Sequence, residues 1–286
     1  MPTRTLQQSQ VAGLHVNEWP GGGTPVLCLP GVGSGGLSWW PLARSLPDAR
    51  VIAPDLRGRG GSQSLTGPAG LLAHARDVKA LVEELDLHEV VVIGHSMGAF
   101  LAPLVVRELG DRVVRVVLVD GGVPPKLPFF MRPVLTRALF RRQFKAMDRD
   151  WPDLEAVARK GKLDALVTAQ PELRPVLLEV LAQEMGGHPD GVLRPRLDAD
   201  RAVADAVDTF FGTDAVEALA ALTVPTYLFA AEHAKSDRDK PFLSDAAIAP
   251  WASRLPCLTV RRLPGNHVTI VFDPSVAAAV ESPPTP

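Results

Sequence analysis

Residues 90–98 read Val-Val-Val-Ile-Gly-His-Ser-Met-Gly and carry the strongest local signal in the sequence. The four apolar, mostly β-branched residues predict a buried strand over 90–93, and an Ala- and Leu-rich helical pattern begins near Met97. The Gly-Xaa-Ser-Xaa-Gly pattern therefore lies at a sharp strand-to-helix turn, where small residues on both sides let the strand and the helix approach closely. Such a turn presents the hydroxyl of Ser96 above the sheet, so Ser96 is the predicted nucleophile.

Further strand-like runs flank this stretch on both sides. They are short, rich in Val, Ile and Leu, and separated by turns containing Gly or Pro; they cover residues 25–29, 51–53, 113–119, 226–229 and 258–263. Near-continuous apolar runs are typical of strands that are buried on both faces of a parallel sheet. Helical patterns at 71–85 and 97–109 alternate with these runs. The alternation predicts an α/β fold with a doubly wound, mostly parallel sheet.

The alternation of strand-like runs and helical patterns stops between Asp120 and about Thr213. In this segment helical periodicity dominates and no strand-like run is found. Apolar residues recur mostly every three or four positions across 131–151, which predicts one face of an amphipathic helix or helix pair. A chain of 286 residues suits one large domain or a core with an insertion. We therefore expect an α/β core formed by residues 1–121 and 214–286, and a helical cap formed by residues 122–213.

The composition excludes several classes of protein. Apolar residues make up 46% of the chain, and 30 Lys and Arg against 32 Asp and Glu leave a net charge of −2, which excludes a wholly disordered chain and a strongly basic nucleic-acid-binding protein. The two cysteines, Cys28 and Cys257, fit neither a disulfide framework nor a zinc-binding spacing. The polar N-terminus lacks the apolar segment of a secretion signal, and Gly and Pro interrupt the uncharged windows. We expect a soluble, cytoplasmic protein without membrane spans.

A serine hydroxyl needs a base to take its proton, and the chain contains seven histidines. Six of them lie in settings that suit surface residues or hydrogen-bonded core residues. His267 differs because it follows the last predicted strand at its carboxyl end, where ligands bind in open α/β sheets. Its place after Ser96 in the chain also suits this type of turn. His267 is the predicted base.

Backbone N–H groups must stabilise the oxyanion that forms when Ser96 attacks a carbonyl group. One predicted donor is Met97, the first residue of the helix. The second is expected in the glycine-rich loop 30–36, with Val32 as the favoured donor and Gly31 beside it. The glycines of this loop match neither the dinucleotide-binding nor the phosphate-binding motif, so we expect no nucleotide cofactor.

Six short motifs occur in order along nearly the whole chain: 29–33 (LPGVG), 55–60 (DLRGRG), 94–98 (GHSMG), 118–120 (LVD), 224–226 (VPT) and 265–267 (GNH). In this order they resemble the α/β-hydrolase fold with a helical cap. The resemblance implies an open α/β core, a Ser-His-acid triad and no metal or cofactor. It also implies that residues 55–60 shape a turn rather than perform chemistry.

The acid of the triad departs from the usual family pattern. The resemblance aligns Ala234 with the Asp that usually follows the strand at 226–229, and an alanine cannot orient a histidine. Asp120 ends the strand next to that of Ser96, and the chain is similar here to zearalenone lactonases and certain haloalkane dehalogenases, which take their acid from that strand end. Asp120 is the favoured acid. Asp237 and Glu232 stay open as alternatives, and a turn-capping role is the alternative for Asp120 itself.

These features predict a serine hydrolase that cleaves a carboxylic ester or lactone through an acyl-enzyme intermediate. The resemblance also argues against dehalogenase and epoxide hydrolase chemistry, for which the family uses Asp as the nucleophile. The alternatives are a lactonase for a zearalenone-like macrolactone, a ligand receptor that turns over esters poorly, and a cofactor-free lyase.

The cap is expected to select the substrate, which we expect to be a small apolar ester or lactone. Trp39 or Trp40 of the core is expected to lie below a group of apolar cap residues, namely Phe129, Phe130, Met131, Phe140 and Trp151. The basic residues between 132 and 145 are expected to form a solvated helix face. No nucleic acid or membrane partner is expected, and the oligomeric state is left open.

Overall fold

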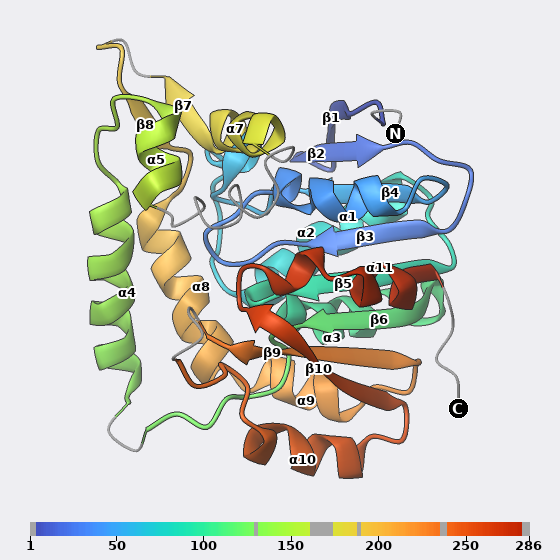
Figure 1. Ribbon diagram of the computed structural model, residues 1–286. Helices are drawn as coiled ribbons and strands as arrows, with labels where there is room; N and C mark the ends of the chain where they lie inside the picture. Colours follow the sequence, from blue (N-terminus) through green and yellow to red (C-terminus); the bar gives the residue numbers. More distant parts are fainter. Residues whose placement is uncertain (1–3, 129–130, 161–173, 188–189, 235–238, 282–286) are drawn as a thin grey trace.

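The computed structural model describes residues 4–128, 131–160, 174–187, 190–234 and 239–281. Its centre is an eight-stranded sheet with the order β1-β2-β4-β3-β5-β6-β9-β10 (Figure 1). The strands are β1 (Gln7–Val11), β2 (Leu14–Trp19), β3 (Pro25–Leu29), β4 (Arg50–Pro54), β5 (Val90–His95), β6 (Val113–Val119), β9 (Thr226–His233) and β10 (Leu258–Asn266). From β4 to β10 every neighbouring pair is parallel, which confirms the predicted α/β fold class.

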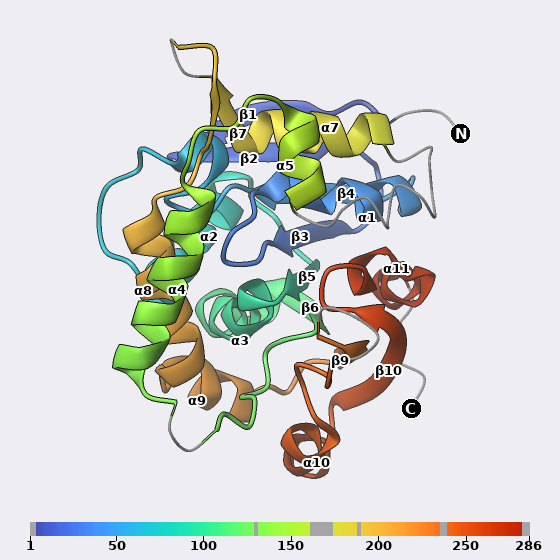
Figure 2. The ribbon, with the colours of Figure 1, turned by 60° about the vertical axis from the view of Figure 1, so that its left-hand side comes forward.

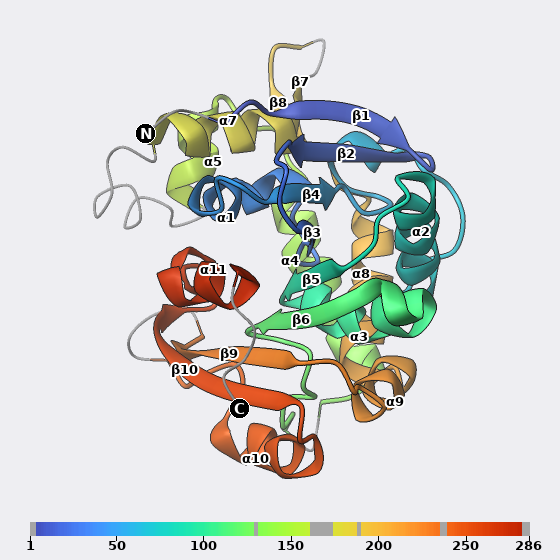
Figure 3. The ribbon, with the colours of Figure 1, turned by 90° about the vertical axis from the view of Figure 1, so that its right-hand side faces the viewer.

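The interior strands are buried because both faces of the sheet are covered. Helices α2 (Leu71–Glu84), α3 (Met97–Leu109) and α9 (Asp214–Ala220) pack on one face, and α1 (Trp40–Ser45) and α11 (Pro274–Glu281) pack on the other (Figure 3). The short helix α10 (Asp245–Arg254) lies beside β10. Two apolar clusters result, one on each side of the sheet, and β5 contributes to both. This double burial explains why residues 90–93 are uniformly apolar instead of alternating.

The two N-terminal strands are not among the apolar strand-like runs found in the sequence. β1 pairs with β2, and β2 pairs with β4, in both cases in the antiparallel direction. The first four residues of β1 are exposed and polar, so this edge strand has no apolar run to reveal it. The sheet is therefore mostly parallel with an antiparallel edge.

Between β6 and β9 the chain forms a set of inserted elements. They are α4 (Pro133–Met147), α5 (Leu154–Lys160), α7 (Arg174–Glu184), β7 (Met185–Gly187), β8 (Leu193–Pro195) and α8 (Ala199–Phe211). Helices α4 and α8 stand at the carboxyl ends of the parallel strands (Figures 1 and 2). The insertion is mainly helical, as predicted, but the expectation that it contains no strand was wrong, because β7 and β8 form a two-stranded antiparallel sheet. Three-residue strands next to glycines are too short to produce an apolar run. The boundaries between core and cap stay a prediction.

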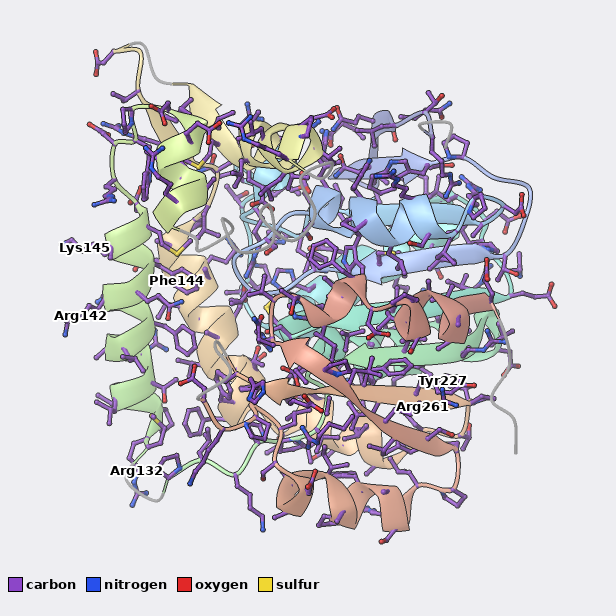
Figure 4. All side chains as sticks on the ribbon, viewed as in Figure 1. Arg132, Arg142, Phe144, Lys145, Tyr227 and Arg261 are labelled. Carbon is purple, nitrogen blue, oxygen red and sulfur yellow. The ribbon has the colours of Figure 1, made fainter. Side chains whose placement is uncertain are left out.

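The predicted apolar face of the inserted helix was also partly wrong. Four of its large apolar residues are exposed: Val134, Leu135, Leu139 and Met147. In α4 only Thr136 and Phe144 are buried, and Phe144 points toward α8 while Arg142 and Lys145 point away (Figure 4). The helix contacts the protein along a narrow line, so periodicity alone overestimated its buried face. The basic side chains of α4 are exposed, as expected.

No described helix combines the length and the apolarity needed to cross a bilayer.

The turn between β5 and α3 depends on two glycines that lie against backbone. A Cβ atom on Gly98 would lie 2.0 Å from the carbonyl oxygen of Leu29, and one on Gly94 would lie 2.1 Å from the carbonyl oxygen of Gly98. Backbone cannot move aside as the end of a flexible side chain can. Helix α3 therefore packs directly onto the ends of β3 and β5 only because both positions lack a side chain.

Replacing Gly98 with Ala should strongly destabilise the fold, because the new methyl group would force α3 away from β3. We expect the free energy of unfolding to fall by at least about 2 kcal/mol, measured by urea denaturation. Gly22→Ala is the matched control, since a Cβ on Gly22 would meet nothing within 4 Å. Equal stabilities of the two variants would show that the close approach of α3 is not a structural requirement.

Candidate active site

Ser96 lies at the turn between β5 and α3 with a strained backbone. Its φ of 54° and ψ of −120° are values that residues other than glycine rarely adopt. The N–H of Ser96 donates to the carbonyl oxygen of Val119 at 3.0 Å, which anchors the turn to β6. This turn places Ser96 at the carboxyl end of the sheet and leaves its side chain partly exposed.

His267 follows the end of β10 and reaches Ser96. Its Nε2 atom lies 3.0 Å from Ser96 Oγ. The side chain of Asn266 accepts the N–H groups of Val268 and Thr269, which tightens the turn that carries the imidazole. The N–H of His267 also donates to the carbonyl oxygen of Ala234 at 3.2 Å, so the loop after β9 holds the histidine backbone.

Asp120 lies directly after β6 and completes a hydrogen-bonded line. Its Oδ2 atom is 2.6 Å from His267 Nδ1, and its side chain is fully buried. The other carboxylate oxygen accepts the N–H of Ala231 at 3.1 Å, while the N–H of Asp120 donates to Phe229. Strand β9 therefore holds both the carboxylate and the backbone of Asp120. An Nδ1–H that donates to Asp120 leaves Nε2 free to accept the Ser96 proton.

Of the two alternative acids, the structure describes only Glu232. Glu232, at the penultimate position of β9, is exposed and belongs to no hydrogen bond with His267 among those described. Asp237 lies outside the described residues. Of the three candidates weighed from the sequence, Asp120 is the one that the described structure brings to the imidazole. Its catalytic role stays a prediction.

Residues 30–36 form a loop, the 30–36 loop, that packs against Ser96. A Cβ on Gly31 would lie 3.5 Å from Ser96 Cβ and 3.6 Å from His95 Nδ1, so this residue is in contact distance of the turn. Met97 is the first residue of α3, where backbone N–H groups lack a partner within the helix. The predicted donors Val32 and Met97 thus belong to the two segments that meet at Ser96. Their role in binding an oxyanion stays a prediction.

Three polar side chains form hydrogen bonds with the backbone of the 30–36 loop. The N–H of Gly36 donates to Asp55 at 2.6 Å, and the N–H of Gly35 donates to Glu184 at 3.0 Å. Arg59 donates through Nε to the carbonyl oxygen of Val32 at 3.0 Å. The sequence assigned residues 55–60, which include Asp55 and Arg59, only to a turn and gave no sign of Glu184, because the partners of these side chains lie far away in the chain.

His95 is a further residue that sequence reasoning treated as unimportant. Its Nε2–H donates to the carbonyl oxygen of His267 at 2.7 Å, and the two rings are 4.8 Å apart. Burial, together with the nearby charge of His267 when protonated, lowers the pKa of His95 to about 3. His95 is therefore a neutral hydrogen-bond donor that supports the turn carrying His267.

A first cavity of about 150 Å³ is lined by His95 and Gly31, which adjoin Ser96, while Ser96 and His267 are not among the described residues that line it. Its wall is formed by Gly31 and Ser34 of the 30–36 loop, the start of α1, one side of α7 and the loop after β10. The described lining residues include Trp39, Trp40 and His95 but no Asp, Glu, Lys or Arg. The cavity therefore suits an apolar, uncharged group.

A second cavity of about 300 Å³ lies on the other side of the 30–36 loop. Gly33 and Gly35 face it, and the inserted elements cover it with Trp151, Leu181 and Glu184. Burial raises the pKa of Glu184 to about 7, and nearby Asp55 adds to the rise while the N–H of Gly35 opposes it.

The aromatic residues predicted to line one pocket are in fact divided. Trp39 and Trp40 line the first cavity and Trp151 lines the second. Phe140 instead stacks on Phe144 and Phe210. Met131 is partly buried and lines neither cavity, and Phe129 and Phe130 lie outside the described residues. Within the described residues, no three His, Cys, Asp or Glu side chains form a metal-binding group.

Comparisons with known proteins place this geometry among related folds. A family model described as alpha/beta hydrolase fold matches residues 24–274. Lipase LipV of Mycobacterium tuberculosis is 36% identical over 111 residues, which cover 38% of this chain and 42% of the lipase. The putative carbamate hydrolase RutD of Azorhizobium caulinodans is 26% identical over 226 residues, 75% of each chain. The chain spans less than half the length of the first curated relatives that it matches.

A solved structure extends the likeness to nearly the whole chain. E-2-(Acetamidomethylene)succinate hydrolase superposes with a TM-score of 0.76 at 24% identity, and the match covers 96% of this chain and 98% of that one. At this identity the likeness concerns the fold.

The neutral state of the half-buried His95 should appear in the pH dependence of stability. Between its pKa of about 3 in the fold and the ordinary value of 6.5, the unfolded chain binds a proton that the folded chain does not. Stability is therefore lost as the pH falls below about 6.5, by up to about 1.4 kcal/mol per pH unit from this group. We expect urea denaturation of His95→Gln to show a smaller loss than the wild type between about pH 7 and pH 5.

His88→Gln serves as the control, because the side chain of His88 is 60% exposed. Its pH dependence should follow that of the wild type. Parallel loss of stability in His95→Gln and the wild type would contradict the assigned state of His95.

Proposed function

The chain belongs to the alpha/beta hydrolase fold family, and from that premise we propose that it is a serine hydrolase that cleaves small apolar carboxylic esters or lactones. One observation carries the proposal. Ser96 Oγ, the imidazole of His267 and the buried carboxylate of Asp120 form a continuous line with contacts of 3.0 and 2.6 Å. A nucleophile, a base and an orienting acid in this order are the parts that acyl transfer requires.

The first half of the reaction forms an acyl-enzyme. Ser96 Oγ attacks the carbonyl carbon of the ester while His267 Nε2 takes the hydroxyl proton. Asp120 accepts the Nδ1–H of His267 and stabilises the imidazolium. The N–H groups of Val32 and Met97 stabilise the oxyanion of the tetrahedral intermediate. When the intermediate collapses, the C–O bond to the alcohol breaks and His267 returns the proton to the leaving oxygen.

The second half releases the acid. A water molecule gives its proton to His267 Nε2 and attacks the acyl carbon, and the collapse of this second intermediate returns the proton to Ser96 Oγ. For a lactone the leaving oxygen remains in the same molecule, so the product is a hydroxy acid. The neutral His95 supports the reaction because a second charge near His267 would oppose formation of the imidazolium.

The first cavity supports an apolar substrate. Its described lining carries two tryptophans and no charged side chain, and one of its lining residues, Gly31, is in contact distance of Ser96. One group of the ester binds there, next to the scissile carbonyl. The names of the relatives, a lipase and a putative carbamate hydrolase, are consistent with cleavage of an acyl bond. We also propose that the protein is cytoplasmic and acts without a metal, cofactor, nucleic acid or membrane partner.

A macrolactone is the second candidate substrate, and the position of the acid favours it. Asp120 follows β6 instead of β9, and zearalenone lactonases, which the chain resembles at this point, also take their acid from that strand end. The cleavage chemistry is the same for both substrates. A higher kcat/KM for a macrolactone than for p-nitrophenyl butyrate would select this candidate.

Ser96→Ala should abolish turnover. On p-nitrophenyl esters of increasing chain length, kcat/KM is expected to fall by about 10⁴-fold or more, because no other group in the line can attack the carbonyl. Ser253→Ala, which removes an exposed hydroxyl on α10, should leave kcat/KM unchanged. A wild type that is inert toward every ester and lactone, yet binds them, would instead indicate a receptor.

Asp120→Asn tests the acid. An amide cannot hold His267 in the tautomer that accepts the Ser96 proton, so kcat should fall by about 10⁴-fold. Glu232→Gln and Asp237→Asn are the controls and should keep kcat within about twofold of the wild type. Loss of activity in Asp237→Asn alone would transfer the role of acid to Asp237.

A further inference from the structure

Arg59 is a buried cation that the proposed chemistry does not use. Its side chain is 1% exposed, which is rare for arginine because a buried charge is costly unless it is paired. It belongs to the segment 55–60, for which the sequence predicted only a turn. The contacts of its guanidinium show where the charge is directed.

The guanidinium contacts both segments that meet at Ser96. Its Nε–H donates to the carbonyl oxygen of Val32 at 3.0 Å, and Nη2 lies 3.7 Å from the Sδ atom of Met97. Nη1 donates to Asp205 at 2.6 Å and to the carbonyl oxygen of Arg57 at 2.8 Å. Val32 and Met97 are the two residues whose N–H groups are proposed to bind the oxyanion.

Two consecutive peptide groups of the 30–36 loop are held in this way. The carbonyl oxygen of Gly31, which shares a peptide plane with the N–H of Val32, accepts the N–H of Ser34 at 3.2 Å. In a trans peptide the N–H points opposite to the C=O, so this bond sets the direction of the Val32 N–H. Arg59 holds the next peptide through the Val32 carbonyl. Rotation at Val32 is therefore restricted from both sides.

Asp205 of α8 provides the counter-charge. It is fully buried, and its carboxylate also accepts the N–H of Gly70 at 2.6 Å and contacts His74 Nε2 at 3.0 Å. Burial would raise the pKa of Asp205, but the hydrogen bond to His74 and the charge of Arg59 outweigh it and lower the pKa below its ordinary value. The carboxylate stays ionised and keeps Arg59 in place.

The inserted elements also hold the backbone around Arg59. The N–H of Gly60 donates to the carbonyl oxygen of Arg196 at 2.9 Å, and the N–H of Asp198 donates to that of Gly58 at 2.8 Å. Arg59 thus lies between the 30–36 loop on one side and the segment leading into α8 on the other.

We propose that Arg59 and Asp205 are positioning residues that set the geometry of the 30–36 loop and couple it to helix α8. Arg59 acts through Val32 and touches no reacting atom. Its effect on rate rests on the proposed serine hydrolase function, whereas its effect on the loop does not. A fork of several N–H groups is required, because a lysine ammonium is a point charge that would bond Asp205 without also reaching Val32 in this geometry.

Arg57 is a matched control on the same turn. Its guanidinium pairs with Asp77 of α2 at 2.5 Å and also donates to the carbonyl oxygen of Thr66. It is largely buried, with a side chain 16% exposed, yet its ion pair faces α2 rather than the 30–36 loop. Arg57→Lys therefore changes the same chemical group without touching the oxyanion segments.

The test compares Arg59→Lys with Arg57→Lys by amide hydrogen exchange and ester kinetics. In Arg59→Lys we expect peptides covering 30–36 to exchange at least about fivefold faster, while peptides from β10 exchange as in the wild type. We expect kcat to fall about 10- to 100-fold with KM within about threefold, because the loss concerns the transition state. In Arg57→Lys both quantities should stay within about twofold of the wild type.

Asp205→Asn is the second variant, used in the same way if Arg59→Lys does not fold. It keeps the size of the side chain and removes the charge that holds Arg59, so the 30–36 loop should again exchange faster and kcat should fall. A kcat within twofold of the wild type in the folded variant overturns the proposal, and so does a rise in KM alone. If the wild type hydrolyses no ester or lactone, the proposed function fails and the exchange of 30–36 alone decides whether Arg59 positions the loop.

Discussion

The contact between helix α3 and the end of β3, made at Gly98, is the constraint on which the rest of the structure depends. Only a residue without a side chain allows the helix to start this close to the sheet, and the short turn then forces Ser96 into its strained conformation. The same turn brings Met97 next to the 30–36 loop and places Ser96 within reach of His267. A tightly packed glycine thus organises a site built from β3, β5, β6 and β10.

Local pattern was sufficient for the elements that are buried on both faces. Helix α3 was predicted with its observed bounds, and β5 with its observed start, because both are strongly apolar and Gly110 follows the helix. His267 was identified from its position after the last strand. Asp120 was favoured through a family resemblance, and in the structure its carboxylate contacts His267. Elements with polar or very short sequences, such as β1 and β7, carry no such pattern and were missed.

The roles of His95, Glu184 and Arg59 could not be derived from the sequence. Each depends on a partner more than twenty residues away: the carbonyl oxygen of His267, the N–H of Gly35 and the carbonyl oxygen of Val32. The exposed face of α4 could not be predicted for the same reason. Periodicity shows that a helix is amphipathic, but it does not show how much of the helix contacts a neighbour. Long-range burial is a property of the packed chain and leaves little local trace.

The 30–36 loop separates the two cavities, since Gly31 and Ser34 face the first cavity while Gly33 and Gly35 face the second. On the proposed mechanism the same backbone also holds the reacting carbonyl, so selectivity and speed share one structural element. Any change of this loop that refits a substrate alters the environment of the transition state as well. On that mechanism, new substrate ranges evolve without a loss of rate through the other walls, such as α1 and α7 around the first cavity and α5 and α7 around the second.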